Sequence, residues 1–499
     1  MNGKPSLAAA STEHVKTYFA GQWHDASGVL YSTEYPFDGS TVATLRAATA
    51  HDVDTAVRFA DHARQQPNWA NLKTQERAAI LHRIAAGIRA RGEELAQLQR
   101  LDNGKPINET RALVASAAAT FQYFAAVCET FESPVTPQRG DFLSMSLYEP
   151  LGVVGAITPW NSPIASEAQK IAPALAAGCA IVIKPAEITP RMAIELARIC
   201  EAAGVPAGIV SVLPGKGSIV GDALVKHPLV KRIAFTGGTR VGLGIARLAA
   251  DKLMPVSLEL GGKSPTIVCA DADLDHAVAG VLYGIFSSSG ESCIAGSRAF
   301  VHASVYEEFK RRVVHGAHAL RVGDPANART QMGPLISASH RASVERYVQI
   351  GLDEGGALLC GGQRLTGADY DQGYFYPPTI FEGLTNQAQM CREEIFGPVL
   401  VLLPWEDEAD LVQQCNDNDY GLACGIWSLN YQTALRLGKA VQAGTVWVNT
   451  YKVFSISTPF AGLKQSGLGR EKGAASMAEY MVQKSFYWGT NAQPLPWSA

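Results

Sequence analysis

The sequence predicts an α/β fold built around a doubly wound parallel sheet. Between residues 151 and 261, short apolar runs alternate with helical segments, a pattern typical of parallel strands covered by helices. A second unit of the same kind begins near residue 264. The chain has 499 residues, of which 47% are hydrophobic and 18% are charged. It is therefore long enough for roughly two to four domains with a large buried core.

The first 130 residues are predicted to be mostly helical. Residues 51–66 and 75–99 carry apolar side chains at positions i, i+3, i+4 and i+7, which is the spacing of one helix face. Asp52 and Thr74 are the candidate N-caps of these two helices. Residues 110–129 are rich in alanine and carry aromatic residues at helical spacing, so a third helix is expected there.

The middle of the chain contains four apolar runs that end in polar or glycine-rich turns. The strands predicted from them are residues 151–157, 180–183, 209–213 and 231–235. The helices predicted with them are residues 163–177, 190–203, 218–226 and 240–253. Thr189 as N-cap, Pro190 in the first turn and Gly204 just past the end mark one helix. Ligands bind beyond the carboxyl ends of such strands, where this chain has TPWN, KPAE and FTGG.

The second α/β unit continues the alternation of strands and helices to about residue 465. Residues 265–269 are its first predicted strand. Residues 273–286 are predicted to form a helix whose N-cap is Asp271 or Asp273, because aspartate is favoured at that position.

Two further segments predict β structure outside these units. Residues 131–150 alternate like an exposed strand or hairpin, and residues 477–489 end in an aromatic, strand-like piece. A strand at the chain end with no partner of its own often pairs with another subunit. We therefore expect these segments to contribute to oligomerisation.

Composition excludes several classes of function. The formal net charge of −3 gives no electrostatic basis for a nucleic acid or membrane partner. The 9 cysteines include no CxxC pair, which is typical of free thiols in a reducing compartment. The 11 histidines show no HxH or HExxH spacing, so no metal site is predicted. No secretory leader is visible, and the apolar stretch 171–183 is too short for a bilayer; we expect a soluble cytoplasmic enzyme.

Cys293 is the candidate nucleophile because its surroundings, FSSSGESCIAGSR at 286–298, are small and polar. A nucleophilic thiolate needs access and local positive potential. Free cysteines are more often buried structural residues, and that interpretation remains open for Cys293 on the residues alone. It is the interpretation we adopt for Cys128, Cys179, Cys200, Cys269, Cys360, Cys391, Cys415 and Cys424.

Glu259 and Asn161 each allow two interpretations. Glu259 lies between two leucines before a Gly-Gly turn. It is either a strand-edge carboxylate paired with Lys263 or a desolvated base with a raised pKa. The GGKS segment is not a phosphate-binding loop, because residue 257 is serine where that motif needs glycine. Asn161 lies in a loop with two prolines; it either caps the next helix or offers its amide to a developing oxyanion.

The strand–turn–helix segment FTGGTRVG at 235–242 suits a dinucleotide, since small residues let a phosphate approach a helix N-terminus. It does not match GxGxxG, so the pattern alone is weak. Lys184 and Glu187, in the KPAE turn, either bind ribose hydroxyls or are solvated loop charges.

Together these segments resemble the NAD(P)-dependent aldehyde dehydrogenase superfamily, from about residue 17 to 488. Further motifs occur in family order: EEIFGPV at 393–399, NDYGL at 418–422, GTVWVN at 444–449 and PFAGLKQSG at 459–467. The resemblance implies a Rossmann-type dinucleotide-binding domain, an α/β catalytic domain and a small β oligomerisation element. Their expected bounds are 16–130 with 151–261, 262–465, and 131–150 with 477–490.

The resemblance also implies a role for each matching residue. Cys293 would be the nucleophile, Glu259 the general base, and Asn161 with the Cys293 backbone N–H the oxyanion hole. Lys170 matches a lysine near the catalytic groups. The residues implied in cofactor binding are Thr158, Trp160, Lys184, Glu187, Gly237, Gly238, Gly242, Glu394 and Phe396.

The implied reaction oxidises an aldehyde to a carboxylic acid through a thiohemiacetal and a thioester on Cys293, hydrolysed by water that Glu259 activates. The carboxylate of Glu187 favours NAD, because a 2′-phosphate would meet like charge; NADP use stays possible. Alternatives are a semialdehyde dehydrogenase, a non-redox cysteine esterase and a non-catalytic structural homologue. A homodimer or homotetramer is expected.

Serines and glutamine stand where relatives often have aromatic residues, which predicts a wide, polar tunnel and a bulky or polar aldehyde. The expected tunnel residues are Ser162, Ser166, Gln169, Ser287, Ser292, Phe454 and Phe460. Lys452 could attract a substrate carboxylate, but we expect it to be solvated.

Overall fold

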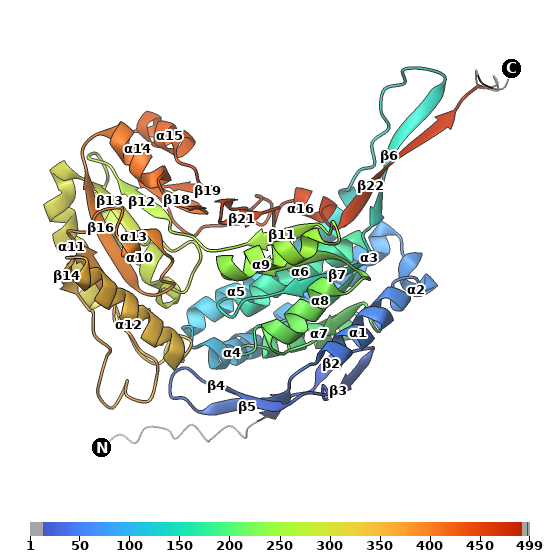
Figure 1. Cartoon of the computed structure of the whole chain (residues 1–499), viewed down its shortest axis with the longest axis horizontal. Coiled ribbons are helices and arrows are strands. Elements are labelled where there is room, and N and C mark those ends of the chain that lie inside the picture. The colour runs from blue at the N-terminus through green and yellow to red at the C-terminus, as the bar shows by residue number, and fades with distance from the viewer. Residues whose placement is uncertain (1–12, 492–496, 498–499) are drawn as a thin grey trace.

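The computed structural model describes residues 13–491 and residue 497. An eight-stranded sheet comes mainly from the N-terminal half, and a seven-stranded sheet comes from the C-terminal half. In Figure 1 the first lies among the blue and green helices, and the second lies among the orange elements on the left. The expectation about a secretory leader concerns mainly residues 1–12, which lie outside the described residues.

The N-terminal region begins with five strands, so the expectation of a mostly helical region was incomplete. β2 and β3 extend the eight-stranded sheet, whereas β1, β5 and β4 form a separate three-stranded sheet. The strands are β1 (Glu13–His14), β2 (Thr17–Phe19), β3 (Gln22–His24), β4 (Leu30–Glu34) and β5 (Thr41–Arg46). None exceeds 6 residues, so their alternation is too brief to stand out in the sequence.

Five helices follow: α1 (Ala50–Ala63), α2 (Pro67–Ala70), α3 (Thr74–Ala90), α4 (Gly92–Asn103) and α5 (Ile107–Thr130). The prediction of one helix over 75–99 was wrong, because the chain leaves helical geometry at Arg91, where φ is −104° and ψ is 17°. Both predicted N-caps were also wrong, since Thr49 caps α1 and Lys73 precedes α3. Asp52 instead accepts a 2.8 Å hydrogen bond from the Thr49 backbone N–H and completes a capping box.

The parallel core of the eight-stranded sheet confirms the four strands predicted in the middle of the chain. In spatial order it contains β11 (Val256–Glu259), β10 (Val230–Thr236), β7 (Val153–Ile157), β8 (Ala180–Lys184) and β9 (Val210–Val212). Ile157 lies opposite both Lys184 and Phe235, and Thr236 lies opposite Glu259. The polar residues that end these strands therefore share one edge of the sheet, as the sequence predicted.

The helices that follow these strands are α6 (Pro163–Ala177), α7 (Arg191–Ala202), α8 (Asp222–Lys226) and α9 (Thr239–Ala250). The prediction for α6 is confirmed at both ends. Pro190, not Thr189, is the N-cap of α7, so that capping prediction was wrong by one residue. The predicted helix 218–226 is a π-helical turn, Gly217–Gly221, followed by α8.

The seven-stranded sheet confirms the second α/β unit. Its order is β14 (Ala357–Cys360), β15 (Thr379–Glu382), β16 (Val399–Trp405), β13 (Arg298–His302), β12 (Pro265–Val268), β18 (Ala423–Trp427) and β19 (Thr445–Val448). Its helices are α10 (Leu274–Phe286), α11 (Tyr306–Ala319), α12 (Ala338–Asp353), α13 (Gln389–Arg392), α14 (Glu408–Asn416) and α15 (Tyr431–Ala440). Asp273 caps α10 by accepting a 3.1 Å hydrogen bond from the His276 backbone N–H, which decides between the two predicted caps.

Three short strands and one helix complete the C-terminal region: β17 (Tyr420–Gly421), β20 (Leu463–Lys464), β21 (Gly467–Leu468) and α16 (Ala475–Ala478). β17 pairs with β20. β21 joins the edge of the eight-stranded sheet beside β11. The C-terminal segment thus returns to the sheet whose edge carries Glu259.

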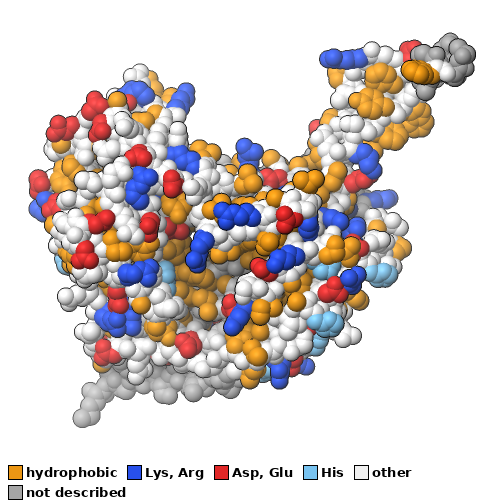
Figure 2. Space-filling model, in the orientation of Figure 1, with side chains coloured by type: hydrophobic (Ala, Val, Ile, Leu, Met, Phe, Trp, Pro, Cys, Tyr) orange, Lys and Arg blue, Asp and Glu red, His pale blue; other side chains and the backbone are white. Residues whose placement is uncertain are grey.

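The C-terminal strand has a partner in its own chain, which corrects the expectation that it lacks one. β22 (Met481–Gly489) pairs antiparallel with β6 (Phe142–Pro150) along its whole length. The two strands form a ribbon that projects from the body in Figure 1, and Figure 2 shows apolar side chains gathered on it. Tyr487 and Trp488 on this ribbon are 67% and 64% exposed.

Among the described residues, α5 alone is long and apolar enough to cross a membrane by length and composition. It packs against α3, α4 and α6, and its Phe121 and Phe124 side chains are fully buried. A core helix passes the same test of length and composition. We therefore interpret α5 as a core helix of the N-terminal region.

Candidate active site

Cys293 lies in a tight loop between α10 and β13. Ser288, Ser289 and Gly290 all have positive φ angles, of 58°, 55° and 74°. A side chain at Gly290 would place its Cβ 2.2 Å from the Gly397 carbonyl carbon, so only glycine fits this turn. Cys293 is half-buried, whereas the other eight cysteines are buried. The structure thus confirms the structural interpretation for those eight and leaves Cys293 as the accessible thiol.

The surroundings of Cys293 do not stabilise a thiolate in the resting protein. Burial, followed by the negative charges of Glu394 and Glu259, raises the pKa of the Cys293 thiol to about 12. The Lys452 ammonium opposes this shift. The thiol therefore rests in its neutral form and must lose its proton when it attacks.

Glu259 ends β11 as a buried carboxylate. Neither of its oxygens has a hydrogen-bond partner among the described residues. Burial, together with the negative charge of Glu471, raises the pKa of Glu259 well above its usual value. The alternative of a surface pair with Lys263 is not what the structure shows, because the Lys263 Nζ is also buried without a hydrogen-bond partner among the described residues. A carboxyl group in this state can act as a base near neutral pH.

Asn161 faces the loop of the thiol instead of capping α6. Its Nδ2 donates a 3.0 Å hydrogen bond to the Glu291 carbonyl oxygen, two residues before Cys293. The N-cap of α6 is Ser162, which makes no side-chain capping bond. The amide is thus held beside Cys293, and the capping alternative was wrong.

Lys170, on α6, is fully buried beside Thr236 and Glu471. Its Nζ donates a 2.7 Å hydrogen bond to Thr236 Oγ1 and forms an ion pair with Glu471. Both groups act on Glu259, since the Glu471 charge raises its pKa and the Lys170 charge lowers it. Glu471 was not predicted, because it lies 4 residues beyond a family motif and nothing local in the sequence marks it.

A cavity of about 680 Å³ brings Cys293, Glu259 and Asn161 together. Its wall includes every predicted tunnel residue: Ser162, Ser166, Gln169, Ser287, Ser292, Phe454 and Phe460. The wall also holds polar residues that were not predicted: Glu109, Ser116, Thr236, Tyr283, Ser288, Glu471 and Lys472. Lys452 also lines the cavity, half-buried, so the expectation that it is solvated was wrong.

A second cavity, of about 500 Å³, lies at the carboxyl ends of the parallel strands. Six of the residues predicted for the cofactor line it: Thr158, Trp160, Lys184, Glu187, Gly237 and Gly238. Gly238 is the N-cap of α9, and a Cβ there would meet nothing within 4 Å. Gly242 does not line this cavity. It is buried, and a Cβ there would lie 2.4 Å from the Leu260 side chain, so Gly242 permits close packing of α9.

Glu394 and Phe396 lie against the Cys293 loop, since they line a small cavity together with Gly290 and Ser292. Glu394 Oε1 accepts a 3.0 Å hydrogen bond from the Gly262 backbone N–H, and burial raises the pKa of Glu394 to about 7. Phe396 has a φ of 58°. Its ring packs edge-on against Trp160 with 5.2 Å between centroids. The two residues thus adjoin Trp160 of the second cavity, although neither lines it.

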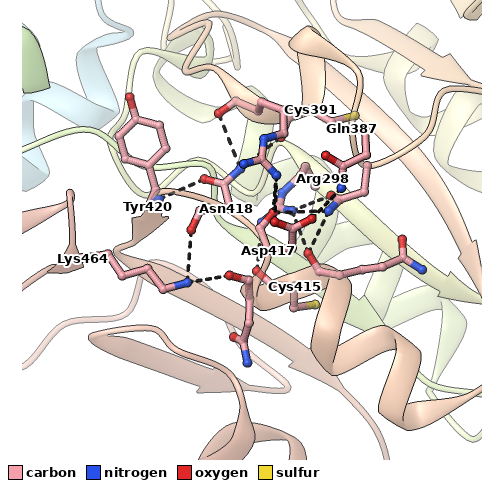
Figure 3. Close-up of polar contacts among 12 residues, drawn as sticks. Arg298, Gln387, Cys391, Cys415, Asp417, Asn418, Tyr420 and Lys464 are labelled. Atoms are coloured by element: carbon pink, nitrogen blue, oxygen red, sulfur yellow. Dashed lines mark hydrogen bonds and ion pairs between the residues drawn. The ribbon is translucent and has the colours of Figure 1, made fainter.

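A buried network holds the C-terminal end of the Cys293 loop (Figure 3). In Figure 3, Arg298 lies beside Cys415, to whose carbonyl it donates a 3.4 Å hydrogen bond. Arg298 also donates hydrogen bonds to the Lys263 carbonyl at 3.0 Å and to Asn386 Oδ1 at 2.7 Å. Asn418 Nδ2 donates to the Cys391 carbonyl at 3.3 Å. Residues from several family motifs therefore hold the loop in place and do not themselves react.

The comparisons with known proteins agree with one another. The family model described as "Aldehyde dehydrogenase family" matches residues 23–486. The DhaS protein of Bacillus subtilis is 41% identical over 474 residues, which are 95% of each chain. A betaine aldehyde dehydrogenase of Bacillus subtilis is 39% identical over 486 residues, 96% of this chain and 98% of that one. Both matches span nearly the whole chain.

Solved structures are equally similar in fold. The NAD+ complex of an aldehyde dehydrogenase from Bacillus cereus superposes with a TM-score of 0.94 and 37% identity, over 98% of this chain and 100% of that one. An NAD-dependent aldehyde dehydrogenase from Sinorhizobium meliloti superposes with a TM-score of 0.96 and 36% identity, over 100% of this chain and 99% of that one.

Proposed function

The chain belongs to the aldehyde dehydrogenase family, and we propose that it oxidises an aldehyde to a carboxylic acid with NAD, through Cys293 and Glu259. One observation carries this proposal: a thiol, a carboxyl group with a raised pKa and a side-chain amide line one cavity. Thr236 lines that cavity and also the second one at the strand ends. The reacting groups and a nucleotide-sized site are thus neighbours.

The second cavity suits a dinucleotide. Its floor is formed by small residues at the start of α9, a 12-residue helix whose N-terminus can hold a phosphate. Lys184 is buried, and desolvation lowers the pKa of its ammonium to about 8, so a hydrogen-bonding ligand would stabilise it. We assign Lys184 and Glu187 to the adenosine ribose and Glu394 to the nicotinamide ribose. When bound there, NAD supplies the hydride acceptor.

The first step that we assign to the chain itself is attack of the Cys293 sulfur on the aldehyde carbon. The thiol proton passes to Glu259 in those molecules in which its carboxyl group is ionised; burial raises its pKa, which makes the ionised form a stronger base and less abundant. The carbonyl oxygen becomes an oxyanion, and the Asn161 amide and the Cys293 backbone N–H donate hydrogen bonds to it. This adduct is the species that is oxidised to a thioester.

Hydrolysis of the thioester is the second step. Glu259, after its proton has passed to solvent, accepts a proton from water, and the hydroxide attacks the thioester carbon. The sulfur leaves as thiolate and the acid is released. The Lys170–Glu471 pair fixes the charge environment of Glu259 throughout.

We further propose a soluble, cytoplasmic homodimer or homotetramer with the three-part domain organisation given above. The argument for an oligomer is the β6–β22 ribbon, which exposes Tyr487 and Trp488. Exposed aromatic side chains on a projecting ribbon favour burial against a second copy. Mass photometry tests this: Trp488→Ser should shift the population toward smaller species, and an unchanged population would contradict the proposal.

The activity itself is tested by NADH formation at 340 nm with a panel of aldehydes, with NAD and NADP in parallel. The bulky and polar members should outperform short alkanals, because the cavity is wide and serine-rich. Cys293→Ala should lose on the order of 10⁴-fold or more of the activity. Binding of NAD or NADP without formation of NADH or NADPH from any aldehyde of the panel would contradict the proposal.

A further inference from the structure

Two lysines reach into the cavity that contains Cys293. Lys452 lies in the loop after β19, and Lys472 follows β21. Their φ angles are 55° and 58°, in the left-handed region that residues with a Cβ rarely adopt. The fold therefore places both side chains at the cavity against a local backbone preference.

Neither ammonium group forms a salt bridge in the part of the chain that the structure describes. The Lys452 Nζ donates a 2.7 Å hydrogen bond to Ser287 Oγ. The Lys472 Nζ lies 3.6 Å from the centroid of the Phe454 ring and 5.2 Å from that of Phe460. A hydroxyl and two ring faces solvate these cations only weakly compared with a carboxylate.

Two carboxylates of the cavity wall are already engaged elsewhere. Glu109 accepts hydrogen bonds from the Ser288 backbone N–H at 2.8 Å and hydroxyl at 2.7 Å. The Lys105 Nζ also lies 3.9 Å from Glu109. Glu471 forms its ion pair with Lys170. Each of these two carboxylates thus has its own lysine.

The third carboxyl group, Glu259, is held toward its neutral form by burial. The charge of Glu109 also acts on Lys452, and that of Glu471 on Lys472. Because the same two carboxylates already face Lys105 and Lys170, positive charge is in excess within the cavity. Desolvation lowers the pKa of each lysine to about 8, which is the effect of burying a cation without enough compensating charge. An anionic ligand would supply that charge.

We propose that the substrate is an aldehyde that also carries a carboxylate, which Lys452 and Lys472 bind while the aldehyde carbon lies against Cys293. This inference rests on the proposed function, because it names the substrate class of the same cavity. Ser287 orients the Lys452 ammonium, and the two phenylalanine rings orient that of Lys472. A charge-assisted hydrogen bond in such a cavity is stronger than one between neutral groups.

Matched substrate pairs test the charge alone. Succinic semialdehyde is compared with pentanal, and 4-carboxybenzaldehyde with 4-methylbenzaldehyde, so that each pair differs mainly in the carboxylate. The wild-type enzyme should show at least about tenfold higher kcat/KM for the anionic member of at least one pair. Equal or better turnover of the neutral member in both pairs would overturn the inference.

Lys452→Met and Lys472→Met remove the charges and keep most of the side-chain volume. Each should raise KM for the anionic substrate about tenfold relative to KM for the neutral partner, so that the ratio of the two kcat/KM values falls about tenfold even where loss of the lysine charge slows both reactions. Lys439→Met, on exposed α15, is the matched control and should change neither. Equal losses for both substrates would assign these lysines to the thiol or to folding and would contradict the inference.

A measurement on the wild-type enzyme covers variants that fail to fold. Glutarate should inhibit oxidation of pentanal competitively and more strongly than pentanoate, because only glutarate has a second carboxylate for the lysines. Equal inhibition by the two acids would contradict the inference. The proposed function is tested separately. Pentanal oxidation that depends on Cys293 supports it, whichever of the two acids inhibits more strongly.

Discussion

The two cavities that share Thr236 are built from different parts of the chain. The cavity of Cys293 is lined by side chains whose ionisation is perturbed: a thiol and Glu259 with raised pKa values, and Lys452 and Lys472 with lowered ones. The second cavity, which we propose holds NAD, is lined largely by strand ends and the glycine turn at the start of α9. One cavity is organised mainly by buried charges, whereas the other combines backbone geometry with one perturbed side chain, Lys184.

This difference indicates how substitutions in each cavity should affect turnover and affinity. A site made from side-chain charges should lose turnover when one group changes, whereas a site made from backbone should lose affinity gradually. Substitutions of the reacting groups in the first cavity should therefore act mainly on kcat, substitutions of Lys452 and Lys472 on KM for the aldehyde, and those in the second cavity mainly on KM for NAD.

The largest effect is expected for Glu259→Gln. Loss of this base should lower kcat by about 10² to 10⁴-fold, as measured by NADH formation. Because the pKa of Glu259 is raised, wild-type activity should fall with decreasing pH well above the usual pKa of a glutamate. The residual activity of the variant should lack that acidic limb. An unaltered pH profile would remove Glu259 from the mechanism.

Asn161→Ala should have the next largest effect. Removing one oxyanion donor lowers kcat by about 10² to 10³-fold in comparable sites, and the affinity for NAD should be unchanged. Steady-state kinetics and nucleotide titration separate the two. Serine at this position is the control, since a shorter donor should recover part of kcat. A rise in KM for NAD with kcat intact would place Asn161 in the other cavity.

Glu187→Gln tests the cofactor cavity. Loss of a charge-assisted hydrogen bond to the ribose should raise KM for NAD about tenfold and leave kcat nearly unchanged. KM for NADP should fall, because the carboxylate no longer repels a 2′-phosphate. An effect on kcat alone would break the division between the two cavities.

The smallest effect concerns stability. Burial raises the pKa of Glu291 to about 8, so the folded protein holds a proton that the unfolded chain releases above pH 4.5. The stability of the wild-type protein should therefore fall as pH rises from 5 to 8. Glu291→Gln should unfold roughly 2–5 °C higher than wild type at pH 8 and show little difference at pH 5. A pH-independent difference would contradict the raised pKa.

The parallel core could be predicted because each of its strands is an apolar run bounded by turn residues, as in Ala180–Lys184 before KPAE. The strands β1 to β5 could not, since they are short and mix polar with apolar residues. The break at Arg91 was hidden because the helical periodicity of the apolar residues continues across it.

The candidate catalytic residues could be proposed from their motifs, whereas most of the charged wall of the cavity could not. Glu109 comes from α5, and Lys472 comes from the C-terminal segment more than three hundred positions later. Such residues meet only through tertiary packing. The same reasoning explains Lys452, whose polarity suggested solvent although its loop folds over the cavity.

We propose above that oxidation proceeds through an acyl group on Cys293. Acid quench during turnover with NAD and aldehyde, followed by peptide mass spectrometry, tests it most directly. We expect an acid-stable thioester on the Cys293 peptide that requires both aldehyde and NAD and is absent in Cys293→Ala. NADH formation without any adduct, or an adduct confined to another cysteine, would contradict it.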